Sequence, residues 1–202
     1  LFRIALQNGC DGVEVHRLCR KCEPNEEIYL NKLVDFKNSH PDKEIVFGLG
    51  VIKFSRGQSD VVASELDSSI KFMEWAVKEC GSRGMNLFTD ALCPPLEPHL
   101  LAALEPHQAG SASATEEDYE KNASHLKTLG DAAASLGVLI ALETHHGYIH
   151  DIPSSCRKLM DMVNHDSVGV NYDAGNIFLN RNGGSIADAF RLIGDKIYYA
   201  HL

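Results

Sequence analysis

The sequence lacks long apolar runs and has few basic residues. No apolar stretch approaches the roughly 20 residues that a membrane-spanning helix needs, so we expect no membrane partner. The 19 lysines and arginines are outnumbered by 28 aspartates and glutamates, which leaves a net charge of −9. Because proteins that bind nucleic acids neutralise phosphates with basic side chains, this balance argues against a nucleic-acid partner.

Cysteines are few, and their spacing indicates no framework of disulfides. Only Cys19 and Cys22 form a C-x-x-C pair, and a structural zinc site needs a second pair of ligands, which the neighbouring sequence lacks. A metal or redox role for this pair is the lesser alternative. We interpret the cysteines as reduced thiols and predict a cytoplasmic protein. The six are Cys10, Cys19, Cys22, Cys80, Cys93 and Cys156.

The apolar residues that the sequence does contain are sufficient for one hydrophobic core. The chain has 202 residues, of which 44% are hydrophobic and 23% charged, as in ordinary globular proteins. This length suits a single domain over residues 1–202. The chain begins within a helical pattern and stops on a strand-like run, so we expect it to be a piece of a longer domain, truncated at both ends.

Six strand-like runs alternate with helical patterns along the chain. This alternation favours a parallel α/β sheet. The strand-like runs are residues 12–16, 44–50, 85–89, 138–143, 168–173 and 197–202. The helical patterns are Phe2–Gln7, Pro24–Ser39, Ser64–Arg83, Thr115–Leu136, Pro153–Val163 and Ser185–Ile193.

Three apolar runs are each followed at once by a residue that can bind a metal: Val138–Leu142 by Glu143, Val168–Tyr172 by Asp173 and Ile197–Ala200 by His201. The intervals between them are each about the length of one strand–helix unit. In a (β/α)8 barrel the carboxyl ends of the strands converge on one face, where active sites lie, so these three residues would meet around one ion. The alternatives are a salt bridge for Glu143, the N-cap of a turn for Asp173 and a core position for His201.

The segments around these residues resemble a known family. Ala141–His145, Val168–Asn176 and Tyr199–Leu202 resemble three successive motifs of the xylose isomerase-like barrel superfamily, and Gly9–Val15 is similar to its second strand. The members of the superfamily include sugar and sugar-phosphate isomerases and epimerases, inosose dehydratases and endonuclease IV. The resemblance implies an α/β fold, a (β/α)8 TIM barrel, of which strands 2 to 7 are present and the first and eighth are missing.

Four further residues are candidates for substrate binding. Glu14 and His16 share one face of their strand, since side chains alternate across a strand, and we expect them to point into the barrel. Glu14 is an equally good candidate for a buried ion pair. His145 is close enough to the first proposed ligand to reach a substrate. Asn176 stands where several ketose epimerases and endonuclease IV have histidine, and this departure argues against those particular activities.

The longest irregular segment is Ala91–Ala114, which contains four prolines. A loop of this length in a compact domain is usually functional or disordered. It follows a strand end, so we predict that it covers the mouth of the barrel.

We interpret the chain as a divalent-metal-dependent isomerase or epimerase whose substrate is a small sugar or sugar-derived carbonyl compound. Two carboxylates and one imidazole suit Mn²⁺, Mg²⁺, Co²⁺ or Zn²⁺. Such an ion stabilises an enediolate, while Glu143 transfers a proton between adjacent carbons. The resemblance implies that a second carboxylate, on the last strand of the barrel, faces Glu143.

Three other functions stay open. An inosose-type dehydratase would use nearly the same residues. An endonuclease IV-like repair enzyme needs several metals and more histidines, and Phe47–Gly50 and Phe88–Asp90 offer none. A non-catalytic sugar-binding barrel would keep the fold without turnover. A homo-oligomer is among the assemblies we consider.

Overall fold

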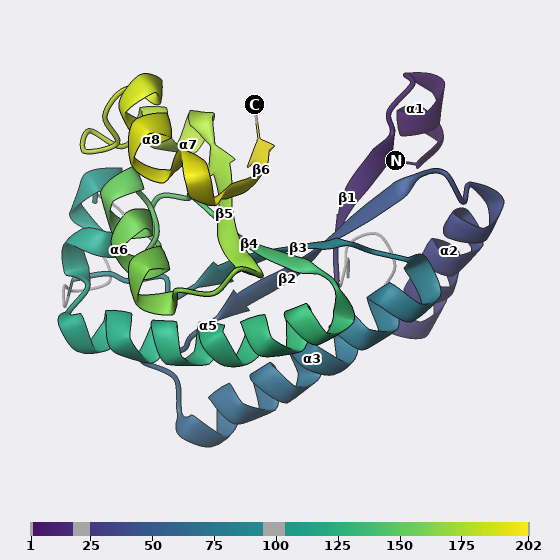
Figure 1. Cartoon of the computed structure of the whole chain (residues 1–202), viewed down its shortest axis with the longest axis horizontal. Helices are drawn as coiled ribbons and strands as arrows, with labels where there is room; N and C mark the ends of the chain where they lie inside the picture. Colours follow the sequence, from purple (N-terminus) through teal and green to yellow (C-terminus); the bar gives the residue numbers. More distant parts are fainter. Residues whose placement is uncertain (1, 18–24, 95–103, 202) are drawn as a thin grey trace.

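The sheet consists of six parallel strands in a computed structural model that describes residues 2–17, 25–94 and 104–201 (Figure 1). Each strand pairs in parallel with the next one along the chain, in the order β1 to β6. This confirms the predicted parallel α/β architecture. Cys19, Cys22 and Leu202 lie outside the described residues. The strands are β1 Gly12–His16, β2 Glu44–Ile52, β3 Gly84–Thr89, β4 Leu139–Glu143, β5 Val168–Asp173 and β6 Ile197–His201.

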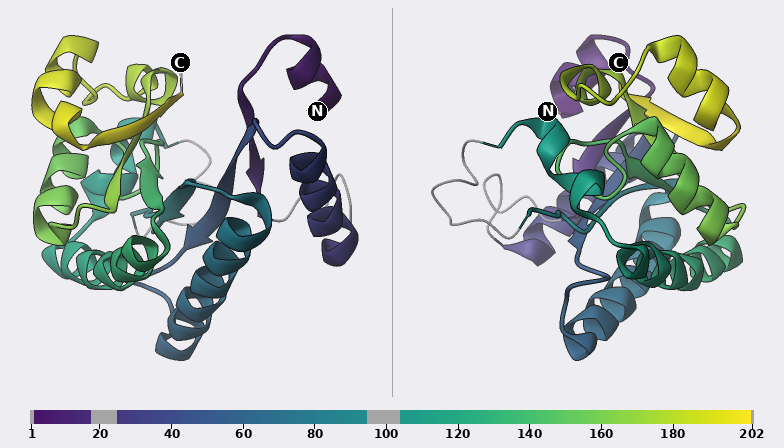
Figure 2. Two further views of the ribbon diagram at one scale, coloured as in Figure 1. Left: turned by 45° about the vertical axis from the view of Figure 1, so that its right-hand side comes forward. Right: turned by 90° about the vertical axis from the view of Figure 1, so that its left-hand side faces the viewer.

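The sheet is strongly curled, and the helices lie outside the curl (Figure 2). β1 and β6 form its two edges, so the six strands make a half-barrel. The two long helices α3 and α5 lie side by side against the outer face of the strands. The helices are α1 Phe2–Gln7, α2 Glu26–Ser39, α3 Ser59–Cys80, α5 Glu116–Leu136, α6 Pro153–Val163, α7 Ala174–Leu179 and α8 Ile186–Ile193.

The two faces of the sheet differ in chemistry because side chains alternate along each strand. Outward-facing residues such as Phe47, Leu87 and Val170 are fully buried in the apolar core that the helices cover. Each side chain of this kind stabilises the fold by about 1.5–3 kcal/mol. The alternate positions, on the concave side, include the polar residues Asn86 and Asn171 besides small or apolar ones such as Ala141. The apolar pattern of the strands therefore directs the polar positions towards the inside of the half-barrel.

Most helices lie within one or two residues of the predicted bounds, and the larger differences concern α3 and α7. α3 begins at Ser59 rather than Ser64 and ends at Cys80 rather than Arg83. It stops there because Gly81 takes a left-handed conformation, with φ of 60°, and its N–H bonds back to the carbonyls of the last turn. α7 was not predicted at all. The side chain of Asp173 starts it, since it accepts a hydrogen bond from the backbone N–H of Asn176.

The described parts of the segment 91–114 lie at the carboxyl ends of the strands. Ala91 forms an antiparallel bridge with Tyr148, in the loop after β4, and Leu92 N–H donates to the carbonyl of Gly147 at 2.8 Å. Gly110 N–H in turn donates to the carbonyl of Leu92 at 2.8 Å. Residues 95–103 lie outside the described part of the chain, and that the segment covers the mouth stays a prediction. None of the described helices is long and apolar enough to cross a membrane.

Arg56 connects the loop before α3 with the start of α5. Its Nη2 lies 2.9 Å from Oδ2 of the buried Asp118 and donates to the carbonyl of Ser113 at 3.0 Å. Asp118 also forms a capping box with Thr115. The hydrogen bond from Arg56 holds the pKa of Asp118 well below its usual range, although burial acts in the opposite direction.

We expect Arg56→Ala to lower the free energy of unfolding by about 1–2 kcal/mol at neutral pH, because the buried carboxylate loses a charged partner that is itself half exposed. A depressed pKa stabilises the fold above the ordinary aspartate pKa of about 3.9, and this contribution is lost as the pH falls further. The deficit of the variant should therefore shrink below about pH 4. Urea unfolding at neutral and acidic pH measures it, and a deficit that does not change with pH would contradict the prediction.

Candidate functional site

The three predicted metal ligands meet at the carboxyl ends of three neighbouring strands. Glu143, Asp173 and His201 are the last residues of β4, β5 and β6. Nδ1 of His201 lies 3.5 Å from Oε2 of Glu143 and 3.5 Å from Oδ2 of Asp173. The register explains this, since Asp173 pairs with His201 across the two strands. The structure thus brings the three side chains to one place.

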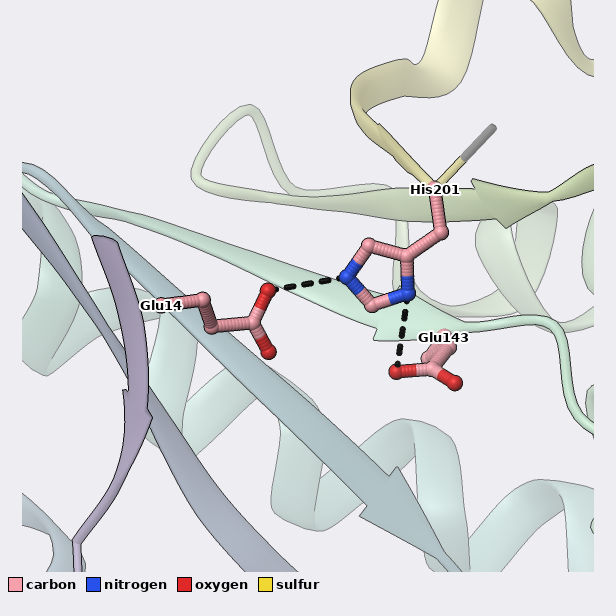
Figure 3. A group of neighbouring side chains, drawn as sticks. All are labelled: Glu14, Glu143 and His201. Carbon is pink, nitrogen blue, oxygen red and sulfur yellow. Dashed lines mark hydrogen bonds and ion pairs between the residues drawn. The ribbon is translucent and has the colours of Figure 1, made fainter. Parts of the chain in front are cut away.

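A fourth side chain reaches the same place from the opposite edge of the sheet. Oε2 of Glu14, on β1, lies 2.8 Å from Nε2 of His201, so the two edge strands meet through their side chains (Figure 3). Glu14, Glu143 and His201 each offer a ligand atom, and these atoms lie within 4.8 Å of one another. Figure 3 shows the imidazole between the two glutamates, with one ring nitrogen towards each.

Two buried asparagines contact the cluster, Asn86 at the two glutamates and Asn171 at His201, and sequence reasoning missed both. Nδ2 of Asn86, on β3, donates to Oε2 of Glu143 at 2.7 Å and to Oε1 of Glu14 at 3.1 Å. Asn171, on β5, has its Nδ2 3.4 Å from Nε2 of His201. A buried amide is costly without partners, so an asparagine in the middle of a buried strand was the available signal.

The electrostatics of the cluster fit a divalent cation. Burial by itself lowers the pKa of His201, but the hydrogen bond and charge of Glu14, together with the charges of Glu143 and Asp173, outweigh it and raise the pKa. Carboxylates this close to one another repel unless a cation or a proton lies between them. The amide oxygens of Asn86 and Asn171 have no hydrogen-bond partner among the described residues, although both atoms are buried. The donor set and the unpartnered oxygens together fit an ion with open positions for a polar ligand.

Asp173 has two roles at once. Its Oδ1 accepts the backbone N–H of Asn176 at 2.8 Å and so caps α7, while its Oδ2 faces His201. Its own backbone N–H donates to Oγ1 of Thr144 at 2.8 Å, which fixes the strand end beside β4. The cap and the ligand interpretations of the sequence are therefore compatible, because they use different oxygen atoms.

An aromatic wall stands beside the cluster and consists of Phe88, His145 and Tyr148. The ring centroids of Phe88 and Tyr148 are 5.0 Å apart, and that of His145 lies 5.7 Å from Phe88 and 5.4 Å from Tyr148. Burial raises the pKa of Tyr148, and the negative charge of Glu143 raises it further, so Tyr148 lies within the electric field of that carboxylate.

The other predicted substrate contacts have separate surroundings. His16 is exposed at the end of β1 and lies over Gly48, in a hollow that Arg17 and Glu65 also line. No hydrogen bond joins it to the cluster in the part of the chain that the structure describes. Asn176 lies beside His146. Burial and the neighbouring His145 lower the pKa of His146, whereas a hydrogen bond with Asn176 acts in the opposite direction.

His150 is a structural histidine. It is fully buried, and its Nε2 accepts the backbone N–H of Thr89 at 3.1 Å. Burial lowers its pKa to about 4, so the ring is neutral at physiological pH. It joins the loop after β4 to the end of β3 and takes no part in the cluster.

A curled parallel sheet with acidic and imidazole side chains at its strand ends defines a barrel-type fold with its site at the carboxyl face. The chain belongs to the xylose isomerase-like TIM barrel family, whose model matches residues 2–202. No curated protein sequence matches it.

Several solved structures share the fold. A D-allulose 3-epimerase from Methylomonas sp., solved in complex with D-allulose, superposes with a TM-score of 0.73 at 16% identity over 99% of this chain and 64% of that one. The probable 3-DHS dehydratase AsbF from Bacillus anthracis gives 0.70 at 17% identity over 100% and 65%. The IOLI protein with a bound zinc atom gives 0.71 at 20% identity over 98% and 65%. The chain thus spans about two thirds of the length of these proteins.

Proposed function

We propose that this protein is a divalent-metal-dependent isomerase or epimerase of a small sugar or sugar-derived carbonyl compound. The observation that carries the proposal is that carboxylate oxygens of Glu143 and Asp173 each lie 3.5 Å from Nδ1 of His201. Two carboxylates and one imidazole are ligands that Mn²⁺, Mg²⁺, Co²⁺ and Zn²⁺ accept. When bound there, the ion supplies Lewis-acid polarisation of a carbonyl oxygen.

Glu143 is the residue we assign to proton transfer. Its carboxylate is buried, and Asn86 holds one of its oxygens, so it has a defined orientation. As a base it takes the proton from a carbon beside the carbonyl, and the C–H electron pair moves towards the carbonyl oxygen to give an enediolate. Return of the proton to the neighbouring carbon isomerises the sugar, provided that the hydroxyl proton moves from one of the two oxygens to the other. In an epimerisation Glu143 keeps the proton, and a second acid gives a proton to the opposite face of the same carbon; the family resemblance implies that this acid is the carboxylate on the last strand of the barrel.

The surroundings of the cluster support a small polyhydroxylated substrate. The unpartnered amide oxygens of Asn86 and Asn171 are acceptors for hydroxyl groups. The wall of Phe88, His145 and Tyr148 offers apolar ring faces beside Glu143 for the C–H groups of such a compound. We propose contacts with substrate for His145 and Asn176, while the position of Glu14 against His201 indicates another role.

A dehydratase is the second candidate, and the orientation of His145 favours it. Nδ1 of His145 lies 2.9 Å from the carbonyl oxygen of His146, which can only accept, so Nδ1 carries the hydrogen. Nε2 is then the nitrogen that takes up and returns a proton. In a dehydration, Glu143 would remove the proton from carbon while protonated His145 gives a proton to the departing hydroxyl group, which leaves as water. No observation favours nucleic-acid cleavage, and the location in the cell and the oligomeric state stay predictions.

The test combines metal analysis with a panel of ketoses, aldoses and cyclic keto-polyols in D₂O, using the full-length protein. We expect one ion per site and turnover that a chelator removes and Mn²⁺ or Co²⁺ restores, with deuterium in the product at the carbon that changes. Loss of water from a substrate would identify the dehydratase instead. Undiminished turnover after complete metal removal would contradict the proposal.

A further inference from the structure

We propose that Glu14 is a positioning residue that sets the tautomer of His201, so that the nitrogen facing Glu143 and Asp173 carries the free lone pair. The inference rests on the proposed metal site and concerns a residue on the opposite edge of the sheet from the three ligands. Metal-binding histidines generally donate their second ring N–H to a carboxylate or carbonyl, which fixes the ring and strengthens the ligand.

The first step of the argument is the hydrogen bond at Nε2. Oε2 of Glu14 lies 2.8 Å from Nε2 of His201, the length of a charge-assisted hydrogen bond. An ionised carboxylate has acceptors only, so Nε2 must be the donor and carries the hydrogen. In the neutral imidazole Nδ1 then has the lone pair.

The second step is the direction of that lone pair. Nδ1 lies at 3.5 Å from both Glu143 Oε2 and Asp173 Oδ2, which is too far for a strong hydrogen bond to either. Nδ1 of His201 thus forms no strong hydrogen bond with either carboxylate and lies between the two. An imidazole with the opposite tautomer would present an N–H there, and an N–H nitrogen cannot bind a metal.

The third step is the rigidity of Glu14 itself. Its second oxygen, Oε1, accepts Nδ2 of Asn86 at 3.1 Å, and the same Nδ2 holds Glu143 at 2.7 Å. One amide group therefore ties the residue that orients the histidine to the residue that we assign to catalysis. Burial, then the negative charge of Glu14 and a hydrogen bond to it, raise the pKa of Tyr199 to about 12, so this phenol stays neutral and is a further hydrogen-bond donor to the carboxylate of Glu14.

A direct ligand role for Glu14 is the competing interpretation, because its carboxylate is among the groups that can reach an ion with Glu143 and His201. Figure 3 argues against it, since Glu14 faces the edge of the ring opposite to the one that faces Glu143. A ligand would also be expected to leave its hydrogen bond to the histidine.

The experiment uses the full-length protein with ¹⁵N-labelled histidine and the variant Glu14→Gln, which keeps the size of the side chain and removes its charge. Glu120→Gln, at an exposed position of α5, is the matched control. The tautomer of His201 is read from its imidazole ¹⁵N shifts in metal-free protein, at a pH high enough for the shifts to show a neutral ring, because the neighbouring carboxylates raise the pKa of His201. The signal is assigned by its absence in His201→Gln. Co²⁺ affinity is measured by absorption titration and folding by thermal unfolding.

We expect His201 in the wild type and in Glu120→Gln to carry its hydrogen on Nε2. Glu14→Gln should shift the ring towards the other tautomer and weaken Co²⁺ binding by about 10–100-fold, the usual effect of a residue that acts through a ligand. An Nδ1–H tautomer in the wild type would overturn the proposal, and this measurement does not depend on the variant folding. Unchanged affinity in Glu14→Gln, or a complete loss that marks a direct ligand, would also overturn it. Absence of Co²⁺ binding by the wild type would instead refute the proposed metal site.

Discussion

Glu143→Gln is expected to lower turnover by about 10²–10⁴-fold, the contribution of a well-placed general acid–base group. The amide cannot accept a proton from carbon at neutral pH, although its oxygen can still accept the hydrogen bond that Asn86 now gives to Oε2 of Glu143. Metal binding should weaken too, because a neutral oxygen replaces an anionic one. The fold should persist, since the substitution preserves size and one hydrogen bond.

The measurements are kcat on the substrate found in the panel, Co²⁺ affinity, and urea unfolding without metal. We expect the metal-free variant to be at least as stable as the wild type, because one of the carboxylates crowded around His201 has lost its charge. Glu120→Gln serves again as the control for a surface charge. A Glu143→Gln protein that turns over at the wild-type rate would remove the catalytic assignment, whereas the metal-binding role would be judged from the titration alone.

Asp173→Asn is expected to weaken metal binding by more than 100-fold while leaving the stability of the metal-free protein nearly unchanged. The reason is that the two carboxylate oxygens of Asp173 have different partners. Oδ2 faces His201, whereas Oδ1 caps α7 by accepting Asn176 N–H. Asparagine caps helices as well as aspartate does, so the cap survives and the anionic ligand is lost. Loss of a direct ligand should exceed the 10–100-fold cost of removing a residue that acts through one.

Asp173→Ala separates the two roles. It should show the same loss of affinity and in addition lose about 0.5–2 kcal/mol of stability, because alanine cannot cap. Ser185→Ala is a matched control, since Ser185 caps the neighbouring α8 by accepting Asp188 N–H at 3.1 Å and has no contact with the cluster among the described residues. It should reduce stability by a similar amount without changing Co²⁺ affinity. Equal affinity in Asp173→Asn and the wild type would contradict the ligand assignment.

The strands were predictable because their signal is local. Runs such as Val168–Asp173 are apolar and end on a polar residue, and this pattern needs no knowledge of the rest of the chain. Helix boundaries were less predictable. The ending of α3 at Cys80 depends on the backbone conformation of Gly81, and α7 depends on whether Asp173 uses an oxygen as a cap. Such decisions involve one hydrogen bond each, which the periodicity of apolar residues does not report.

Only some residues of the candidate site could likewise be predicted from the sequence. Glu143, Asp173 and His201 were identified from their spacing, since one strand–helix unit separates each from the next. Asn86 could have been suspected as a buried polar residue in a strand, but its two partners lie 72 and 57 positions away along the chain. His16 shares a strand with Glu14, yet it lies exposed over Gly48. Alternation gives the face of a side chain and does not say how far neighbouring side chains cover it, and the residue that pairs with His16 is Gly48, which has no side chain.

The sequence alone determined the parallel α/β class, the order of the elements and the three residues that end β4, β5 and β6. Each of these follows from periodicity and spacing, which are properties of the chain within one or two elements. Only the tertiary structure decided that Glu14 meets His201, 187 positions apart, with an oxygen 2.8 Å from a ring nitrogen. That contact depends on the curl of the sheet, which sums small twists between all neighbouring strands. No local pattern encodes that sum, so the partner of His201 was decided by the packing of the whole half-barrel.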